Sequence, residues 1–200
     1  MYIPGRRYKN LNLYDLILSA QENDFDALEE LIKREQKNIY TAFCYLGASK
    51  ENIADLTQDA LLRMSKGIKN LKNPRTFKSW LGRIITNLFY DELRKKKKTP
   101  DSVSIESFNN PDGDECPLCI CDNTHRPDDK TMEKELSVLI RKNIRALPEH
   151  FRIVIILREL QGLSYEEIAV ITKTNVGTVK SRISRARNRL KETLKPYLAQ

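Results

Sequence analysis

The chain has 200 residues, and its 35 Lys and Arg residues against 27 Asp and Glu give a formal net charge of +8. Hydrophobic residues make up 40% and charged residues 31%, which suits one ordinary domain or two small ones. No apolar stretch approaches the roughly 20 residues of a membrane span, and the N-terminus lacks the apolar run of a secretory signal. These features exclude collagen-like, membrane-spanning and fully disordered chains. We expect a cytoplasmic protein whose basic excess favours a polyanionic partner, with nucleic acid first.

The first hundred residues are predicted to be helical, because their apolar residues recur at a spacing of three and four. Residues 11–46 carry this pattern up to Gly47, a natural helix stop, and a third helix is expected over Asn52–Ile68. Asn73-Pro74 is a start signal, since Asn can cap a helix and Pro is tolerated in the first turn. One long helix is then predicted from Thr76 to Lys98.

This long helix has two different faces. Its apolar stripe is predicted to be core rather than a platform for bases, and consists of Phe77, Trp80, Leu81, Ile84 and Leu88. A polar ridge follows positions i, i+4, i+7 and i+11 on the opposite edge, with Arg83, Asn87, Tyr90 and Arg94. Asn can hydrogen-bond a base edge and Tyr can stack on a base, but periodicity alone favours an ordinary solvated helix face.

The character of the sequence changes after Lys98. Residues 99–135 contain four prolines, ten acidic and three basic side chains, and no helical stripe, which predicts an acidic linker. Helical periodicity resumes over Leu136–Ile144, and Leu147-Pro148-Glu149 starts a further helix. The sequence shows no strand pair and no repeat, so the predicted fold class is all-α, with two small helical domains joined by this linker.

Residues 164–190 have the pattern of a helix-turn-helix. Ser164 and Glu167 have the spacing of a capping box, and Asn175 can cap the next helix after a four-residue turn. That second helix is predicted to bury Val179 and Ile183, while cationic and hydroxyl side chains crowd its other faces. Such a helix suits the major groove, because Arg can pair with a guanine edge and Ser or Thr can reach phosphates or bases. An exposed cationic helix on a soluble bundle is the alternative, and the capped helix in front argues against it.

Long motifs in both halves of the chain carry a family resemblance. Leu157–Ala169 and Val176–Arg187 closely resemble the −35-binding domain of bacterial sigma-70 family factors of the extracytoplasmic-function (ECF) type. Asp55–Ala60 resembles the segment with which such factors bind the clamp of core RNA polymerase, and Phe77–Arg94 is similar to their −10-binding helix. The matches cover most of residues 25–195 in the family's order. Asp59 stands where Glu is common in the family, which shortens the reach to the clamp without changing its charge.

The resemblance implies three sets of site residues. The set for core RNA polymerase is Asp55, Gln58 and Asp59. The set for −10 DNA is Arg83, Asn87, Tyr90, Arg94, Lys95, Lys96, Lys97 and Lys98. The set for −35 DNA is Thr178, Lys180, Ser181, Arg182, Ser184 and Arg185. Without the resemblance, the two Asp would be interpreted as favourable charges near a helix start, and the lysine run as solvated.

The expected domain organisation follows the same resemblance. It has a leader and short helix over residues 1–24, a region 2 type domain over 25–98, the acidic linker over 99–135 and a region 4 type helix-turn-helix domain over 136–200. Acidic linkers commonly serve solubility. In sigma factors the corresponding connector threads through polymerase channels meant for nucleic acid, and negative charge would suit such a channel.

The linker also holds a compact group of potential metal ligands, Cys116, Cys119, Cys121 and His125. Four soft ligands fit tetrahedral Zn²⁺, but common zinc folds use two separated pairs. A redox switch and plain reduced cysteines remain alternatives. No resident cofactor is expected beyond this possible zinc, and Cys44 is predicted to be core.

The predicted function is that of an alternative sigma factor. It would bind core RNA polymerase and promoter DNA, open the −10 region and start transcription of a promoter subset, with an anti-sigma factor as a further possible partner. No catalytic constellation is found, so no enzyme is expected. The alternatives are a dimeric helix-turn-helix regulator that never engages polymerase and, more distantly, a helical RNA-binding protein.

Overall fold

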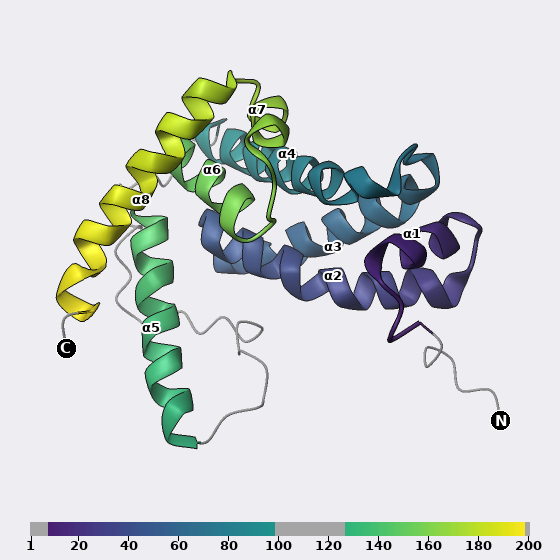
Figure 1. Cartoon of the computed structure of the whole chain (residues 1–200), viewed down its shortest axis with the longest axis horizontal. Coiled ribbons are helices and arrows are strands. Elements are labelled where there is room, and N and C mark those ends of the chain that lie inside the picture. The colour runs from purple at the N-terminus through teal and green to yellow at the C-terminus, as the bar shows by residue number, and fades with distance from the viewer. Residues whose placement is uncertain (1–7, 99–126, 199–200) are drawn as a thin grey trace.

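The structure, a computed structural model, describes residues 8–98 and 127–198, with side chains over 8–96 and 136–197 (Figure 1). Eight α-helices and two short 3-10 helices make up these ranges, which contain no strand. The N-terminal group comprises α1 (Leu13–Gln21), α2 (Phe25–Leu46), α3 (Lys50–Gly67), η1 (Ile68–Asn70), η2 (Pro74–Thr76) and α4 (Phe77–Lys98). The C-terminal group comprises α5 (Pro127–Arg145), α6 (Glu149–Glu159), α7 (Tyr165–Thr172) and α8 (Val176–Leu198). The predicted all-α fold class is confirmed.

The N-terminal helices begin and end at residues suited to these places. The side chain of Asp24 accepts a hydrogen bond from the Ala27 N–H at 3.1 Å and caps α2. Gly47 ends α2 in the left-handed conformation at φ 84°, which favours glycine. Asn73 caps the short η2 turn, with Pro74 as its first residue, and α4 follows directly. The start and stop signals predicted at Asn73-Pro74 and Gly47 are therefore confirmed.

Helix α4 is buried over a wider arc than one apolar stripe. Phe77, Leu81 and Leu88 belong to the core as predicted, and so does Cys44 on α2. Trp80 and Ile84, which were also expected in the stripe, are only partly buried, and the unpredicted Ile85 and Phe89 are fully buried instead. The reason is that α4 contacts α2 and α3 on one side and α7 on another.

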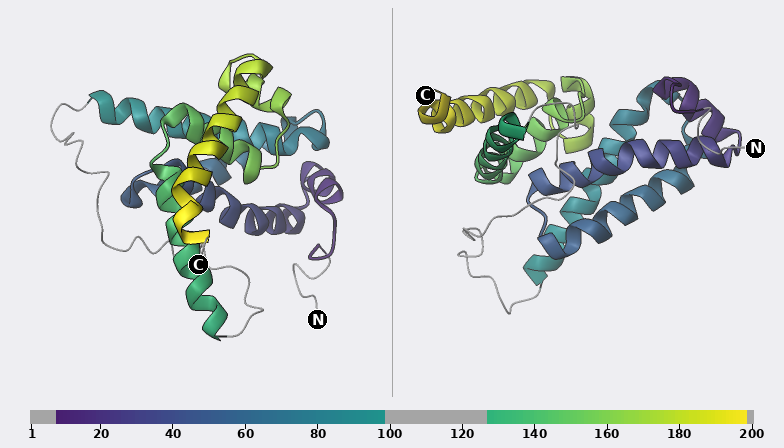
Figure 2. Two further views of the ribbon diagram at one scale, coloured as in Figure 1. Left: turned by 60° about the vertical axis from the view of Figure 1, so that its left-hand side comes forward. Right: turned by 90° about the horizontal axis from the view of Figure 1, so that it is seen from below.

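The segment between α4 and α5 is shorter than the predicted linker, because α5 already begins at Pro127. The prediction placed no helix between residues 99 and 135. Proline at a first helical position followed by acidic residues is typical of a helix start, and Pro127-Asp128-Asp129 carries this signal. Helices α5 and α8 then run side by side at the edge of the molecule away from α1 (Figure 2).

The two helical groups pack against each other through one continuous core. Gly82 on α4 lies under Leu157, Leu163 and Ile171, and a Cβ at Gly82 would sit 3.1 Å from the Leu163 Cδ1 atom. At the C-terminal end of α2, the Arg152 guanidinium donates to the Leu46 carbonyl at 2.9 Å, and Arg145 Nε donates to the Cys44 carbonyl at 2.9 Å. Cations at this end of a helix complement its dipole, so two arginines of the C-terminal group cap a helix of the N-terminal group.

Candidate nucleic-acid interface

Helices α7 and α8 form the predicted helix-turn-helix. The capping box is present in both directions: Ser164 N–H donates to Glu167 Oε2 at 2.8 Å, and Glu167 N–H donates to Ser164 Oγ at 3.2 Å. Lys173 turns the chain with a left-handed φ of 53°. The Thr178 N–H then donates to Asn175 Oδ1 at 2.7 Å, so Asn175 caps α8 as predicted.

Helix α8 fully buries one stripe and leaves most of its other side chains exposed. Val179, Ile183 and Ala186 are buried against α6 and α7. Of the six predicted −35 contacts, four are exposed, namely Lys180, Ser181, Ser184 and Arg185, and two are partly buried, Thr178 and Arg182. The structure therefore gathers these side chains on the open sides of one helix, where a major groove could receive them.

On α4, the predicted ridge is exposed except at one position. Arg83, Asn87 and Arg94 face solvent, whereas Tyr90 is half-buried. Arg94 forms an ion pair with Asp91 at 3.0 Å, on its own helix. Further along, Lys95 and Lys96 are exposed, and the side chains of Lys97 and Lys98 lie outside the described part.

Tyr90 marks the place where the two predicted DNA-binding surfaces meet. Burial raises the pKa of its hydroxyl, Glu149 raises this pKa further and Arg182 lowers it. Glu149 begins α6 and Arg182 lies on α8, so one charged group from each of these C-terminal helices influences this residue of α4. The structure thus brings one −10 candidate close to one −35 candidate.

The three residues predicted to bind the polymerase clamp lie on α3. Asp55, Gln58 and Asp59 are all exposed, while Leu56 and Ala60 between and beside them are buried. A negatively charged, solvent-facing strip of this kind can meet a cationic partner without disturbing the core behind it.

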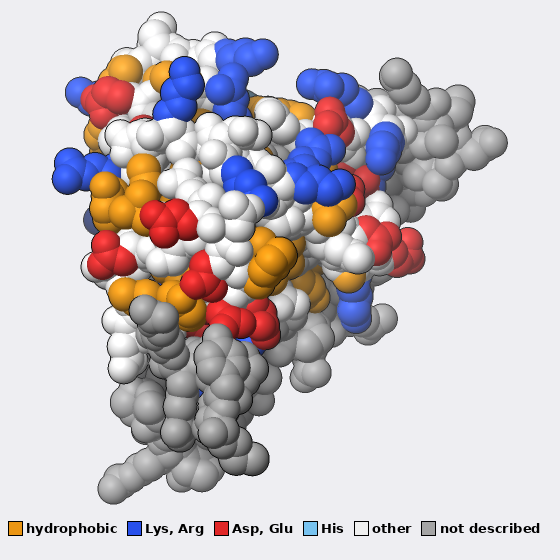
Figure 3. All heavy atoms as spheres, turned by 90° about the vertical axis from the view of Figure 1, so that its right-hand side faces the viewer, with side chains coloured by type: hydrophobic (Ala, Val, Ile, Leu, Met, Phe, Trp, Pro, Cys, Tyr) orange, Lys and Arg blue, Asp and Glu red, His pale blue; other side chains and the backbone are white. Residues whose placement is uncertain are grey.

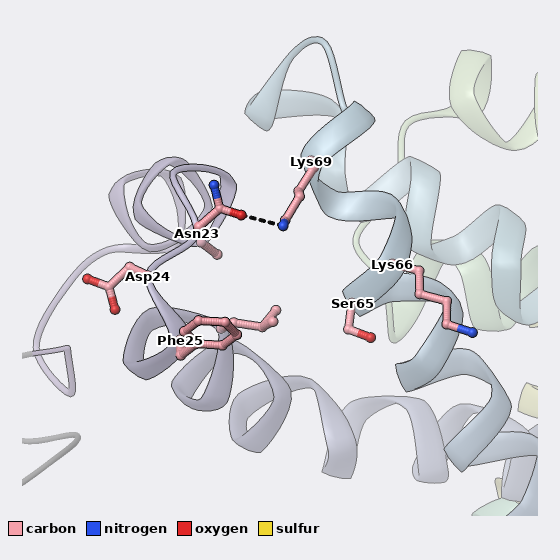
Figure 4. Close-up of a pocket in the computed structure, with 8 residues that line it drawn as sticks. Asn23, Asp24, Phe25, Ser65, Lys66 and Lys69 are labelled. Atoms are coloured by element: carbon pink, nitrogen blue, oxygen red, sulfur yellow. Dashed lines mark hydrogen bonds between the residues drawn. The ribbon is translucent and has the colours of Figure 1, made fainter.

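Figure 3 shows one face of the described surface, on which most Lys and Arg side chains lie in the upper half and most Asp and Glu lie below. A shallow pocket of about 310 Å³ lies between the start of α2 and the end of α3 (Figure 4). Its lining includes Phe25, Lys66 and Lys69, and the Lys69 ammonium donates to the side chain of Asn23. None of the predicted DNA or polymerase contacts lines it.

The predicted ligand group Cys116, Cys119, Cys121 and His125 lies outside the described residues. Over residues 8–96 and 136–197, whose side chains the structure describes, no group of three or more His, Cys, Asp or Glu side chains is placed to hold a metal ion. In the same ranges, no helix combines the length and the apolar character needed to cross a bilayer.

The sequence did not predict the cluster of charged groups around Tyr165, the first residue of α7. Arg158 lies 4.9 Å from the centre of its ring and Lys180 lies 6.0 Å from it. Nearby, Glu159 pairs with Arg187 at 2.6 Å, and this hydrogen bond is the main reason why the pKa of Arg187 is raised. These contacts join residues of three different helices, so no periodicity within one helix could reveal them.

This geometry defines an all-helical protein with a helix-turn-helix in its C-terminal group, a motif typical of DNA-binding proteins. Comparison with family models matches residues 31–99 to "Sigma-70 region 2" and residues 137–190 to "Sigma-70, region 4". The ECF RNA polymerase sigma factor SigW of Bacillus subtilis is 32% identical, over 90% of this chain and 95% of its own length. The chain belongs to the sigma-70 family, among the ECF RNA polymerase sigma factors.

Other similar proteins are also sigma factors. The ECF RNA polymerase sigma factor SigE of Mycolicibacterium smegmatis is 28% identical over 86% of this chain, which spans 63% of that relative. Among solved structures, the sigma factor RpoE of Bartonella quintana, in complex with the anti-sigma factor NepR, superimposes with a TM-score of 0.59 at 26% identity. This match covers 84% of this chain and 96% of the solved one.

Proposed function

We propose that this protein is an alternative sigma factor that binds core RNA polymerase, recognises the −35 and −10 elements of a promoter subset, and promotes strand opening. The observation that carries the proposal is the presence of both sigma regions in order along one chain, each with its predicted contact residues largely exposed. The polymerase would supply the chemistry, and this chain would supply recognition without catalysis of its own. It would act in the cytoplasm, where its DNA and polymerase partners are found.

The C-terminal domain would recognise the −35 element as duplex DNA. Lys180, Ser181 and Arg185 project from the N-terminal half of α8, which is the part of a recognition helix that reaches base edges. Arg pairing with a guanine edge is worth about 1–3 kcal/mol of discrimination against the wrong base. The contact would be completed by Arg182 and by the hydroxyl groups of Thr178 and Ser184, which are available for phosphates or bases.

The N-terminal domain would hold the opened −10 strand. Arg83, Asn87 and Arg94 offer cationic and amide groups along one ridge, and the Tyr90 ring offers a stacking face. Lys95 to Lys98 would add phosphate contacts next to them. On α3, the exposed Asp55, Gln58 and Asp59 would bind the polymerase clamp.

The observed packing has a geometric consequence for this proposal. The −35 and −10 elements lie about 25 base pairs apart, or roughly 85 Å along a duplex that rises about 34 Å per turn. In the structure, α4 packs against α7, and Gly82 of α4 lies under Leu163 and Ile171 beside the helix-turn-helix. Both elements cannot be bound at once from such neighbouring surfaces, so the two domains would have to separate when the promoter is engaged.

Run-off transcription with core RNA polymerase and a library of promoter fragments tests the proposal, with and without this chain. Stimulation that depends on the chain is expected. If no fragment is stimulated but the chain binds duplex DNA as a dimer, a conventional helix-turn-helix regulator is the better description. An anti-sigma partner, like the NepR bound to the Bartonella relative, would be identified by co-purification from the native host.

A further inference from the structure

Tyr165 lies at a junction of the helix-turn-helix that the proposed contacts do not include. It is the first residue of α7, and its ring is partly buried. The Arg158 guanidinium, from α6, lies 4.9 Å from the ring centre, and the Lys180 ammonium, from α8, lies 6.0 Å from it. Cations are attracted to the negative face of an aromatic ring at such distances, so this ring connects all three helices.

The ring itself is held from two directions. The capping box between Ser164 and Glu167 fixes the backbone on either side of Tyr165. Arg158 is fixed in turn, because its guanidinium donates to the Leu163 carbonyl at 2.7 Å in the turn before α7. Tyr165 therefore presents a constrained aromatic surface to whichever side chain approaches from α8.

Lys180 is that side chain, and it is also a proposed −35 contact. Lysine has a long flexible stem, so a lysine that is free in solution loses conformational freedom when it binds DNA. Attraction to the ring narrows its conformations beforehand. The carboxylate of Glu166 also attracts Lys180. The pKa of Glu166 is lowered mainly by hydrogen bonds with its own backbone and with Ser164, and the charge of Lys180 lowers it further.

We propose that Tyr165 is a positioning residue for −35 recognition, whose ring orients the Lys180 side chain before the duplex binds. The inference rests on the proposed function, because it needs Lys180 to contact −35 DNA. Tyr165 itself need not touch the DNA.

A double-mutant cycle in the full-length chain tests this role, with binding to a −35 duplex measured by fluorescence anisotropy. Tyr165→Leu removes the aromatic face, and we expect binding to weaken about twofold to fivefold. Tyr165→Phe keeps the face and should bind like the wild type. In a Lys180→Ala background, Tyr165→Leu should have no further effect. The matched control is Lys191→Ala, a change at an exposed lysine further along α8. The effects of Tyr165→Leu and Lys191→Ala on DNA binding should multiply.

A DNA-free measurement separates this inference from the proposed function. The ring current of Tyr165 should shift the Lys180 methylene resonances upfield in the wild type and in Tyr165→Phe, but not in Tyr165→Leu. Unshifted resonances in the wild type, effects of Tyr165→Leu and Lys180→Ala that multiply, or equal losses in the Leu and Phe variants would overturn the positioning role. A wild type that shows the shift but does not bind any −35 duplex refutes the proposed function, and the positioning role with it.

Discussion

The two long cationic helices, α4 and α8, differ in how much of their surface is free. Helix α8 buries a single stripe and keeps Lys180 and Arg185 exposed, whereas α4 is enclosed on two sides and its Tyr90 is half-buried. A helix with an open face can enter the groove of a duplex as it stands. Tyr90 would become fully accessible only if the C-terminal helices moved away. The comparison therefore predicts that α8 can read a duplex as it stands, whereas −10 strand capture by the whole ridge of α4 would require the two helical groups to separate.

The largest effect is expected on the N-terminal domain, at a surface that neither DNA helix uses. Charge reversal by Asp55→Lys together with Asp59→Lys should abolish co-purification with core RNA polymerase. Both side chains are exposed, so the helical circular dichroism signal should remain. Glu51→Lys, at an exposed residue near the start of the same helix, is the matched control and should retain polymerase. Retained co-purification in the double variant would refute the clamp assignment.

The next prediction distinguishes phosphate binding near α4 from base recognition on α8. Replacing Lys95, Lys96, Lys97 and Lys98 by Ala should weaken binding to all promoters alike, because phosphates carry no sequence information. The log–log salt slope should fall by about 0.9 for each duplex phosphate that the variant no longer neutralises. Arg185→Ala should instead change the preference among −35 sequences. Weaker binding to one promoter alone in the lysine variant would contradict this assignment.

A third prediction addresses the junction between the two domains. Arg152 is 9% exposed, and its guanidinium donates to the Leu46 carbonyl at the end of α2. Arg152→Ala removes this buried donor and should lower the free energy of unfolding by about 1–3 kcal/mol, measured by urea denaturation. Arg63→Ala, at an exposed arginine on α3, should leave stability nearly unchanged. Equal stability of the Arg152 variant and the wild type would show that the packing does not depend on this cap.

The fold could be predicted where local signals decide the structure. The caps at Asn73, Ser164 and Asn175 each act within three residues of the chain, and the sequence identified all of them. The second buried side of α4 and the Arg152 contact could not be predicted, because they join residues about 75 to 106 positions apart. The same holds for the contact of Tyr165 with Lys180, which depends on how α7 crosses α8. Exposure on α3, α4 and α8 is compatible with the predicted sites, and their roles remain predictions for the experiments above.

The smallest expected effect concerns a buried carboxyl group on α2. Glu35 on α2 is 8% exposed, and burial raises the pKa of its carboxyl, although Asn38, Lys78 and Arg34 partly oppose this. The folded chain therefore keeps a proton at pH values where the unfolded chain has released it, so this group's contribution to stability falls as the pH rises from the ordinary carboxyl pKa to the raised one. At pH 7 the buried ionised carboxylate destabilises the fold.

Glu35→Gln should accordingly raise the free energy of unfolding at pH 7, by less than about 1 kcal/mol, and the gain should vanish as the pH falls below the ordinary carboxyl pKa. The amide can still accept the hydrogen bond that Asn38 donates to Glu35 at 3.2 Å. Glu29→Gln, at an exposed residue of the same helix that pairs with Lys33, should give no gain. Urea denaturation at pH 4 and pH 7 checks both variants. A gain at pH 7 would mean that burial of the Glu35 carboxylate costs the folded chain stability, whereas lower stability of Glu35→Gln at pH 7 would mean that the attraction of Glu35 to Lys78 and Arg34 outweighs its burial.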